Sequence, residues 1–264
     1  MGFTLITGAS SGIGEALARA LAARAVPLVL TARRQERLEA LAAELHQRHG
    51  IEVISLPADL ANPTGVRQLL ASIESRGLEI DGLVNNAGFG LRGDFHTQPW
   101  EKAEAMLQLM VSAPVQLTGA LLPAMRARGH GRIVNVASLA GLVPGLPGST
   151  LYSASKAFLI RFSQSLAAED WKHGIQVMAL CPGYVRSEFH AVLGVEERMK
   201  KLPGLFWMDA NALAERTLRA LEQQRVVVVP GRVNQLIAAL ARLLPDGAAG
   251  ALSGAFSRRY RREP

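Results

Sequence analysis

Cysteine is nearly absent from the sequence, because Cys181 is the single one among 264 residues. One thiol excludes a disulfide within the chain and any metal site built from a cysteine cluster. No secretory signal is visible either, because the short apolar run Phe3–Thr7 has no basic residues before it and leads directly into glycine-rich sequence. With cysteine so rare and no signal, we expect a protein of a reducing compartment and place it in the cytoplasm.

Charged and aromatic residues are also scarce, at 19% and 5% of the chain, whereas 49% of the residues are hydrophobic. A composition this apolar excludes a disordered chain. The formal net charge of +7 raises the question of a nucleic-acid partner. However, no stripe of basic and aromatic residues follows an expected helix, and residues 232–264 hold six arginines against two acids. We therefore expect a basic tail on an ordinary domain, no nucleic-acid partner, and a preference for anionic cofactors or substrates.

Two stretches without any charge are long enough to be considered as membrane spans, residues 105–125 and 133–155. The first is interrupted by two glutamines, a serine and a proline, and the second contains three glycines and two prolines. Both are typical of buried segments, and we expect no stable membrane insertion.

Short apolar runs alternate with segments of helical periodicity along most of the chain. Apolar strands separated by helices are typical of a parallel sheet covered on both faces. We predict an α/β fold, a single doubly wound Rossmann-type domain with about seven parallel strands in the order 3-2-1-4-5-6-7. Strands are expected at Phe3–Thr7, Leu28–Ala32, Ile51–Leu56, Gly82–Asn86, Gly131–Ser138, Ile175–Cys181 and Val226–Val229. Helices are expected at Gly12–Ala25, Gln35–His49, Pro63–Arg76, Pro99–Arg128, Tyr152–His173 and from Asp209 to Gln223.

The domain is expected to cover residues 1–264, with a core over 3–230 and an amphipathic extension over 231–264. In the extension, apolar residues recur at helical spacing up to Pro245, at Val233, Leu236, Ile237, Leu240, Leu243 and Leu244. This face predicts a helix packed on its own domain, a subunit contact, a wall of a lipophilic pocket or a membrane-surface helix. The irregular segment Val185–Met208 is either a surface helix pair or a lid over a substrate pocket.

Glycines cluster in Thr7–Gly14, which reads Thr-Gly-Ala-Ser-Ser-Gly-Ile-Gly between the first expected strand and helix. Glycines there permit a tight turn and a close approach of a dinucleotide pyrophosphate to the helix N-terminus. Residues 8–12 also match G-x-S-x-G, the nucleophile elbow of serine hydrolases. A hydrolase would place several strands before the elbow and an Asp and His pair after it, and the sequence offers neither. We therefore favour the dinucleotide loop.

The end of the second expected strand indicates which nicotinamide cofactor binds. An acid about 20 residues past the loop would bind the ribose 2′-hydroxyl of NAD, but this stretch reads Thr31-Ala32-Arg33-Arg34. The Arg33 guanidinium can instead pair with a 2′-phosphate, so we predict NADP(H). The alternative is a solvated arginine pair at a helix start.

Tyr152 and Lys156 are four residues apart and share one helix face. An ammonium beside a phenol lowers the pKa of the phenol, so that Tyr152 can exchange a proton with a carbonyl oxygen. Ser138 ends the preceding strand, where its hydroxyl can hold the same substrate oxygen. His46 and His49 lie three apart on a helix, but with no third ligand nearby we predict no metal site.

The order and spacing of these motifs show that the chain resembles the short-chain dehydrogenase/reductases over residues 3–230. The matching motifs are Thr7–Gly14, Asp59-Leu60, Asn85-Asn86-Ala87-Gly88, Ser138, Tyr152 with Lys156, and Pro182-Gly183 with Ser187. The resemblance implies the catalytic set Ser138, Tyr152 and Lys156. Together with Arg33, it implies these cofactor-binding residues: Gly8, Ser10, Ser11, Gly12, Ile13, Gly14, Arg33, Asp59, Leu60, Asn86, Ala87, Gly88, Tyr152, Lys156, Pro182, Gly183, Val185 and Ser187.

Particular roles follow from the resemblance. Asp59 is expected to bind the adenine amino group, and Lys156 also to hold the nicotinamide ribose. Asn86, Ala87 and Gly88 are expected to line the adenosine side of the cofactor and to brace the central sheet. Pro182 and its neighbours border the nicotinamide, and Ser187 stands where the family usually has threonine. Family members commonly pair through the two long helices, which implies a homodimer or homotetramer.

Met110 departs from the family, which has a catalytic asparagine at this position. Methionine is a poor ligand for the water of a proton relay to Lys156. We therefore expect an NADPH-dependent oxidoreductase that interconverts a ketone or aldehyde and its alcohol, with a lipophilic or 3-oxoacyl-type small-molecule substrate. The alternative is a non-catalytic NADP(H)-binding sensor of the same fold.

Overall fold

The structure is a computed structural model, and it describes residues 2–91, 93–145, 147–189, 202–243 and 250. Seven strands form one parallel sheet, and they are β1 (Phe3–Thr7), β2 (Leu28–Thr31), β3 (Val53–Ser55), β4 (Ile80–Asn85), β5 (Gly131–Val136), β6 (Ile175–Leu180) and β9 (Val227–Val228). Their spatial order is β3-β2-β1-β4-β5-β6-β9. Because β9 is the seventh strand of this sheet along the chain, this order confirms the predicted order 3-2-1-4-5-6-7.

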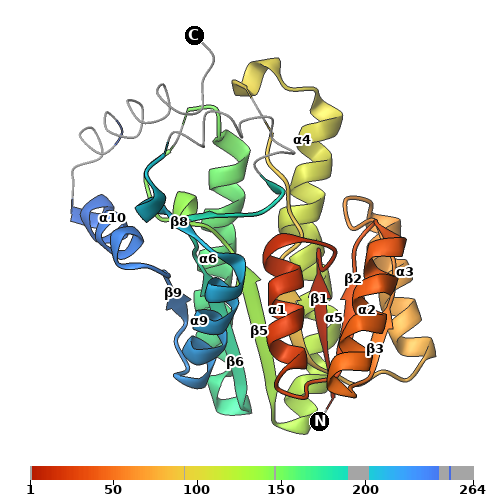
Figure 1. Cartoon of the computed structure of the whole chain (residues 1–264). Helices are drawn as coiled ribbons and strands as arrows, with labels where there is room; N and C mark the ends of the chain where they lie inside the picture. Colours follow the sequence, from red (N-terminus) through yellow and green to blue (C-terminus); the bar gives the residue numbers. More distant parts are fainter. Residues whose placement is uncertain (1, 92, 146, 190–201, 244–249, 251–264) are drawn as a thin grey trace.

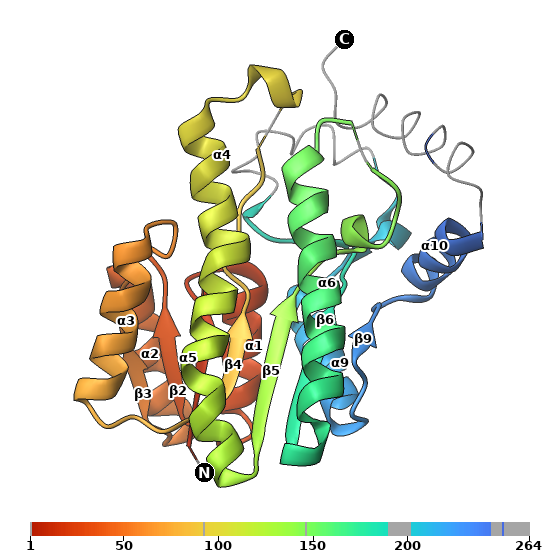
Figure 2. The same cartoon turned by 180° about the vertical axis from the view of Figure 1, so that it is seen from behind.

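Helices cover both faces of this sheet (Figures 1 and 2). One face carries α1 (Gly12–Ala22), α2 (Gln35–His49) and α9 (Ala210–Glu222). The other carries α3 (Pro63–Ser75), α4 (Trp100–Leu107), α5 (Ala113–Arg128) and α6 (Thr150–Asp170). The doubly wound α/β fold is therefore confirmed.

The apolar strands supply two cores, one on each face of the sheet. Leu5 packs with the α3, α5 and α6 side, whereas the next residue, Ile6, packs with the α1, α2 and α9 side. Leu83 and Val84 of β4 divide in the same way. Since successive side chains of a strand point to opposite faces, a strand buried on both sides is apolar at most of its positions.

The predicted helix over Pro99–Arg128 is continuous but not uniformly α-helical. Residues Gln108–Ser112 form a π-helical stretch between α4 and α5. Pro114 has no N–H to donate to the carbonyl of Met110, four residues earlier, which explains why the α-helical pattern is interrupted there. By length and composition this 29-residue helix could cross a membrane, but its α5 part packs on α3, β4 and β5.

A buried row of polar side chains crosses the second core. The Asn85 amide of β4 donates to the Asn135 carbonyl oxygen of β5 at 2.8 Å, and the two residues are register partners. The Asn135 amide donates in turn to the Ser163 hydroxyl of α6 at 2.9 Å. That hydroxyl donates to the backbone oxygen of Leu159 at 2.7 Å. Each link satisfies a polar group that would otherwise be unpaired in the core.

The irregular segment contains a small second sheet that the sequence pattern did not predict. Its ends form β7 (Tyr184–Val185) and β8 (Trp207–Met208), which pair in parallel, with the 3₁₀ turn Gly204–Phe206 directly before β8. The lid interpretation falls partly on residues 190–201, which lie outside the described residues.

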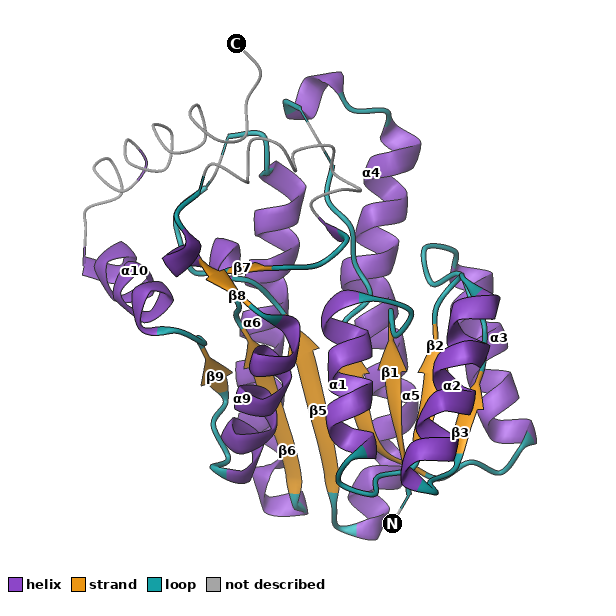
Figure 3. Ribbon diagram, in the orientation of Figure 1, coloured by secondary structure: helices purple, strands orange, loops and turns teal. Residues whose placement is uncertain are grey.

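The C-terminal extension begins with α10 (Arg232–Leu243). Figure 3 shows α10 beyond β9, the edge strand of the main sheet, and α10 contacts the 3₁₀ turn that precedes β8. The end of the expected apolar face at Leu244 and Pro245, and the arginines of the basic tail after Arg242, lie outside the described residues.

Candidate active site

A cavity of about 810 Å³ opens at the carboxyl ends of the strands, where ligands of doubly wound sheets bind. All the catalytic and cofactor-binding residues predicted from the sequence line it, with the exception of Gly14. The structure thus brings together side chains from seven separate segments of the chain. At Gly14 a Cβ atom would overlap the backbone oxygen of Gly8, so the missing side chain lets the loop and α1 pack closely. The assignment of Gly14 to the cofactor site stays a prediction.

The glycine loop leaves a cradle without side chains. Gly8 and Gly12 have φ values of +66° and +60°, which favour glycine. A Cβ atom at Gly8 would lie 2.9 Å from the Cα of Ala87, and one at Gly12 would lie 2.9 Å from the Cβ of Ser187. Helix α1 begins at Gly12, so its free N–H groups point toward the cradle. This cradle fits a pyrophosphate.

Asn86 holds this loop to the central sheet. Its amide donates to the backbone oxygens of Thr7 at 2.8 Å and Gly8 at 3.2 Å. The Thr7 hydroxyl in turn accepts the backbone N–H groups of Asn86 and Ala87, both at 2.9 Å. The expected bracing by Asn86 therefore has a direct geometric basis in these bonds.

Two arginines line the adenosine end of the cavity, Arg33 as predicted and Arg34, which the sequence reasoning did not assign. Arg34 donates to the hydroxyls of Ser10 at 3.1 Å and Ser11 at 2.8 Å. Two guanidinium groups next to a cradle of N–H donors form a donor set suited to a phosphate on the ribose.

Glu188 joins this end of the cavity to the segment after β7. Its carboxylate accepts from Arg34 and from Arg37, both at 2.7 Å. Hydrogen bonds from Arg37 and Arg34 lower the pKa of Glu188 to about 2. The neighbouring residue, Ser187, packs against Gly12, so two successive residues contact the glycine loop and the start of α2, respectively. Nothing in the sequence pattern singled out Glu188, because its partners lie about 150 positions earlier.

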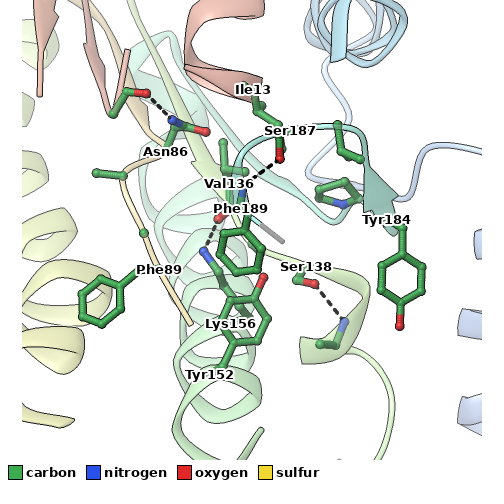
Figure 4. Close-up of a pocket in the computed structure, with 18 of the residues that line it drawn as sticks. Ile13, Asn86, Phe89, Val136, Ser138, Tyr152, Lys156, Tyr184, Ser187 and Phe189 are labelled. Atoms are coloured by element: carbon green, nitrogen blue, oxygen red, sulfur yellow. Dashed lines mark hydrogen bonds between the residues drawn. The ribbon is translucent and has the colours of Figure 1, made fainter. Parts of the chain in front are cut away.

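Ser138, Tyr152 and Lys156 meet deeper in the cavity (Figure 4). Ser138 follows β5 and caps a short 3₁₀ turn, its oxygen accepting from the N–H of Ala140 at 3.1 Å. Tyr152 and Lys156 both stand on the first turns of α6, and the Lys156 Nζ lies 5.7 Å from the centre of the Tyr152 ring. Phe189 packs against that ring with its centroid 5.7 Å away.

Lys156 is buried, with 5% of its surface exposed, and its ammonium donates to the backbone oxygen of Val136 at 2.7 Å. Burial lowers the pKa of Lys156 from 10.5 to about 8, so the group is still mostly protonated at pH 7. Met110 is also buried and packs behind Gly88: a Cβ atom at Gly88 would lie 3.6 Å from the Met110 sulfur and 3.8 Å from the Lys156 nitrogen. A buried thioether therefore lies where the resemblance places the asparagine of the family.

The other end of the cavity is apolar, and we call it the apolar half. It is lined by Val143, Tyr184, Phe206, Leu236, Ile237 and Leu240. Of the four interpretations of the C-terminal apolar face, the wall of a lipophilic pocket is the one that these lining residues support.

Cys181 and the His46–His49 pair, which the sequence also offers as candidates, form no metal site with other described residues. Cys181 is fully buried below the cavity. His46 makes a 2.8 Å contact with the backbone oxygen of Ile51, and the described part of the chain holds no group of three residues suited to a metal ion.

Comparison with known proteins agrees with this geometry. Residues 3–197 match the family of the short chain dehydrogenases. Over 240 residues the chain is 32% identical to the ketoacyl reductase HetN of Nostoc sp., an alignment that covers 91% of this chain and 82% of that protein. The chain therefore belongs to the short-chain dehydrogenase family, whose members are oxidoreductases that use nicotinamide cofactors.

Two solved structures share the whole architecture. One is a short-chain dehydrogenase from Sphingobium yanoikuyae in complex with NADPH, 36% identical with a TM-score of 0.81, covering 96% of this chain and 94% of that one. The other is a bulky-bulky ketone specific alcohol dehydrogenase from Comamonas testosteroni, 31% identical with a TM-score of 0.78 and the same coverage.

Proposed function

We propose that the protein reduces a ketone or aldehyde with NADPH, or oxidises the corresponding alcohol with NADP⁺. The observation that carries the proposal is the meeting of Ser138, Tyr152 and Lys156 in one cavity with the glycine loop. The nicotinamide supplies the hydride for the carbonyl carbon when the cofactor is bound.

The roles of the three side chains follow from their chemistry. The Ser138 hydroxyl orients the carbonyl oxygen of the substrate, and the Tyr152 hydroxyl gives that oxygen its proton as negative charge develops on it. The buried Lys156 ammonium stabilises the phenolate that Tyr152 leaves behind. Lys156 also lies where it can hold a ribose hydroxyl, next to Gly88 and Val136.

The choice of NADP(H) over NAD(H) is supported by the charge at the adenosine end. Arg33 and Arg34 line the cavity there, and the stretch Thr31–Arg34 has no acid that would select the ribose hydroxyl of NAD. The structure from Sphingobium yanoikuyae, 36% identical to this chain, is a complex with NADPH.

The substrate is one of two classes within this proposal, a 3-oxoacyl-type compound or a lipophilic ketone. HetN is named a ketoacyl reductase, and the Comamonas testosteroni enzyme is named for bulky ketones. Fold similarity alone does not choose between these classes. Assembly into a two-fold symmetric oligomer in the cytoplasm stays a prediction.

A second candidate function is a sensor that binds NADP(H) without turnover. It is favoured by one observation, the buried Met110 sulfur near Lys156 in place of an asparagine. The complete Ser138–Tyr152–Lys156 set favours the enzyme.

The replacement of Tyr152 by phenylalanine tests the proposal, because it removes the proton donor and keeps the ring. We expect reduction of an accepted ketone to fall about 10²- to 10⁴-fold, while NADPH binding, followed by cofactor fluorescence, changes little. Tyr184→Phe is the comparison variant, because it removes a second phenol that lines the cavity and keeps Tyr152; an equal loss of reduction there would contradict the assignment of the proton donor to Tyr152. Native-like turnover by Tyr152→Phe would disprove the assignment, and a native protein that binds NADPH but reduces no carbonyl compound would favour the sensor.

A further inference from the structure

Helix α10 exposes large apolar side chains that its own domain does not cover. Leu236 is 60% exposed, Leu240 is 47% exposed and Leu243 is 80% exposed. Leu236 and Leu240 line the cavity, but Leu243 does not. The two inner leucines therefore face the space that a ligand of the cavity would fill, one turn apart on the same side of the helix.

The position of α10 is tied to the expected nicotinamide site. Asn234 is 7% exposed, and its amide donates to the backbone oxygen of Pro230 at 2.7 Å. The same side chain lies directly on Gly183, where a Cβ atom would be 2.5 Å from the Asn234 Oδ1. The close approach of Asn234 to the Pro182–Gly183 turn fixes the first turn of α10 beside the reaction centre, so the inner leucines form a wall at a set distance from it.

The apolar half contains no ionisable group other than the phenol of Tyr184 among its described residues. The charged residues that line the cavity all belong to the nucleotide end or to the catalytic set, and they are Arg33, Arg34, Asp59, Lys156 and Glu188. A carboxylate, sulfonate or phosphate placed against Leu236 and Leu240 would lose its hydration and gain no cation from the described residues of the apolar half. A neutral apolar substituent would instead remove its own surface and that of the leucines from water.

We infer that Leu236 and Leu240 of α10 select neutral ketones with a bulky apolar substituent, and that the apolar half excludes anionic carbonyl compounds. This inference rests on the proposed carbonyl reductase function and names its substrate class.

Three ketones of graded size and charge test the selection: acetone, benzophenone and benzophenone-4,4′-dicarboxylate. The dicarboxylate is symmetric, so either orientation directs one carboxylate toward α10. For the native protein with NADPH, we expect kcat/KM for benzophenone to exceed that for the dicarboxylate by at least about tenfold.

Single replacements on α10 then show which leucines cause the preference for benzophenone. Leu236→Ser and Leu240→Ser should each lower kcat/KM for benzophenone about tenfold and leave acetone reduction and the NADPH dissociation constant nearly unchanged. Leu243→Ser is the matched control on the same helix, and it should change none of these values. Leu240→Arg supplies the missing cation, and the dicarboxylate should gain about tenfold relative to benzophenone.

The inference is overturned if the native protein accepts the dicarboxylate as well as benzophenone, or if Leu243→Ser costs as much as the inner replacements. Thermal unfolding of each variant shows whether a loss comes from a damaged fold. If the native protein binds NADPH but reduces none of the ketones, the proposed reductase function is wrong, and the inference about the apolar half is tested separately by binding. The dissociation constants of benzophenone and of its dicarboxylate from the NADPH complex are then measured by cofactor fluorescence. The inference requires benzophenone to bind at least about tenfold more tightly than the dicarboxylate.

Discussion

Replacing Lys156 with methionine should abolish carbonyl reduction and, at pH 7, raise the free energy of unfolding. Burial lowers the pKa of Lys156 from 10.5 to about 8. That difference corresponds to about 3 kcal/mol for keeping the buried ammonium charged below pH 8. Methionine has a similar length and no charge, so this cost disappears in the variant.

One lost hydrogen bond opposes this gain. The Lys156 ammonium donates to the backbone oxygen of Val136 at 2.7 Å, and methionine leaves that buried oxygen without this donor. An unpaired buried carbonyl costs about 1–2 kcal/mol. We therefore expect the variant to be more stable than the native protein by roughly 1–2 kcal/mol at pH 7.

The sign of this difference should depend on pH. Between about pH 8 and pH 10.5 the unfolded chain holds the Lys156 proton more tightly than the folded chain, so native stability rises with pH through this window. The variant has no ammonium at this position, so its free energy of unfolding does not rise in this way between pH 8 and pH 10.5. Its advantage should therefore shrink above pH 8 and become a deficit of about 1–2 kcal/mol once Lys156 is neutral in both states.

Urea unfolding at pH 7 and pH 10, followed by circular dichroism, measures both differences. Lys102→Met, on the exposed face of α4, is the matched control because it makes the same chemical change at a hydrated site. A difference between native protein and Lys156→Met that stays the same at both pH values would refute the reasoning, and so would a variant less stable at pH 7.

Two further predictions concern the cofactor and the proton supply. Arg33→Ala should weaken NADPH binding about 10- to 100-fold and leave NADH binding nearly unchanged; similar dissociation constants for both cofactors in the native protein would contradict it. Met110→Asn should raise the single-turnover rate of reduction several-fold, because an amide holds relay water better than a thioether. An unchanged rate in the folded variant would show that the carbonyl of Met110, which Pro114 leaves without its α-helical donor, or another group already supplies the relay.

Much of the fold follows from local sequence signals. Apolar runs predicted all seven strands of the main sheet because a strand covered on both faces has few polar positions. Strand ends were less predictable, since pairing with a neighbour sets them: Ile51–Leu56 shortens to Val53–Ser55 beside β2. The π-helical stretch was not predicted either, although Pro114 is a visible signal that the carbonyl of Met110 loses a partner.

The residues of the site also divide into those that a local sequence pattern predicts and those whose role depends on the fold. Glycine spacing, Arg33 and the Tyr152–Lys156 pair are local patterns, and the structure places them all on one cavity. Arg34 was considered only as the neighbour of Arg33, because its contacts with Ser10 and Ser11 arise only when β2 lies beside β1.

The buried row of amides behind the active site also fixes how far α6 can slide along β5. Ser163 is held by Asn135, and two helical turns nearer the cavity Lys156 is held by the backbone of Val136, the very next residue of β5. A shift of the helix by one turn would break both attachments together and leave several polar groups unpaired in the core. The alignment of the lysine with the strand end is thus maintained by a second anchor that never touches the ligand. A hydrophobic replacement of Asn135 should therefore affect the position of Lys156 at the end of β5 more than the stability of the fold.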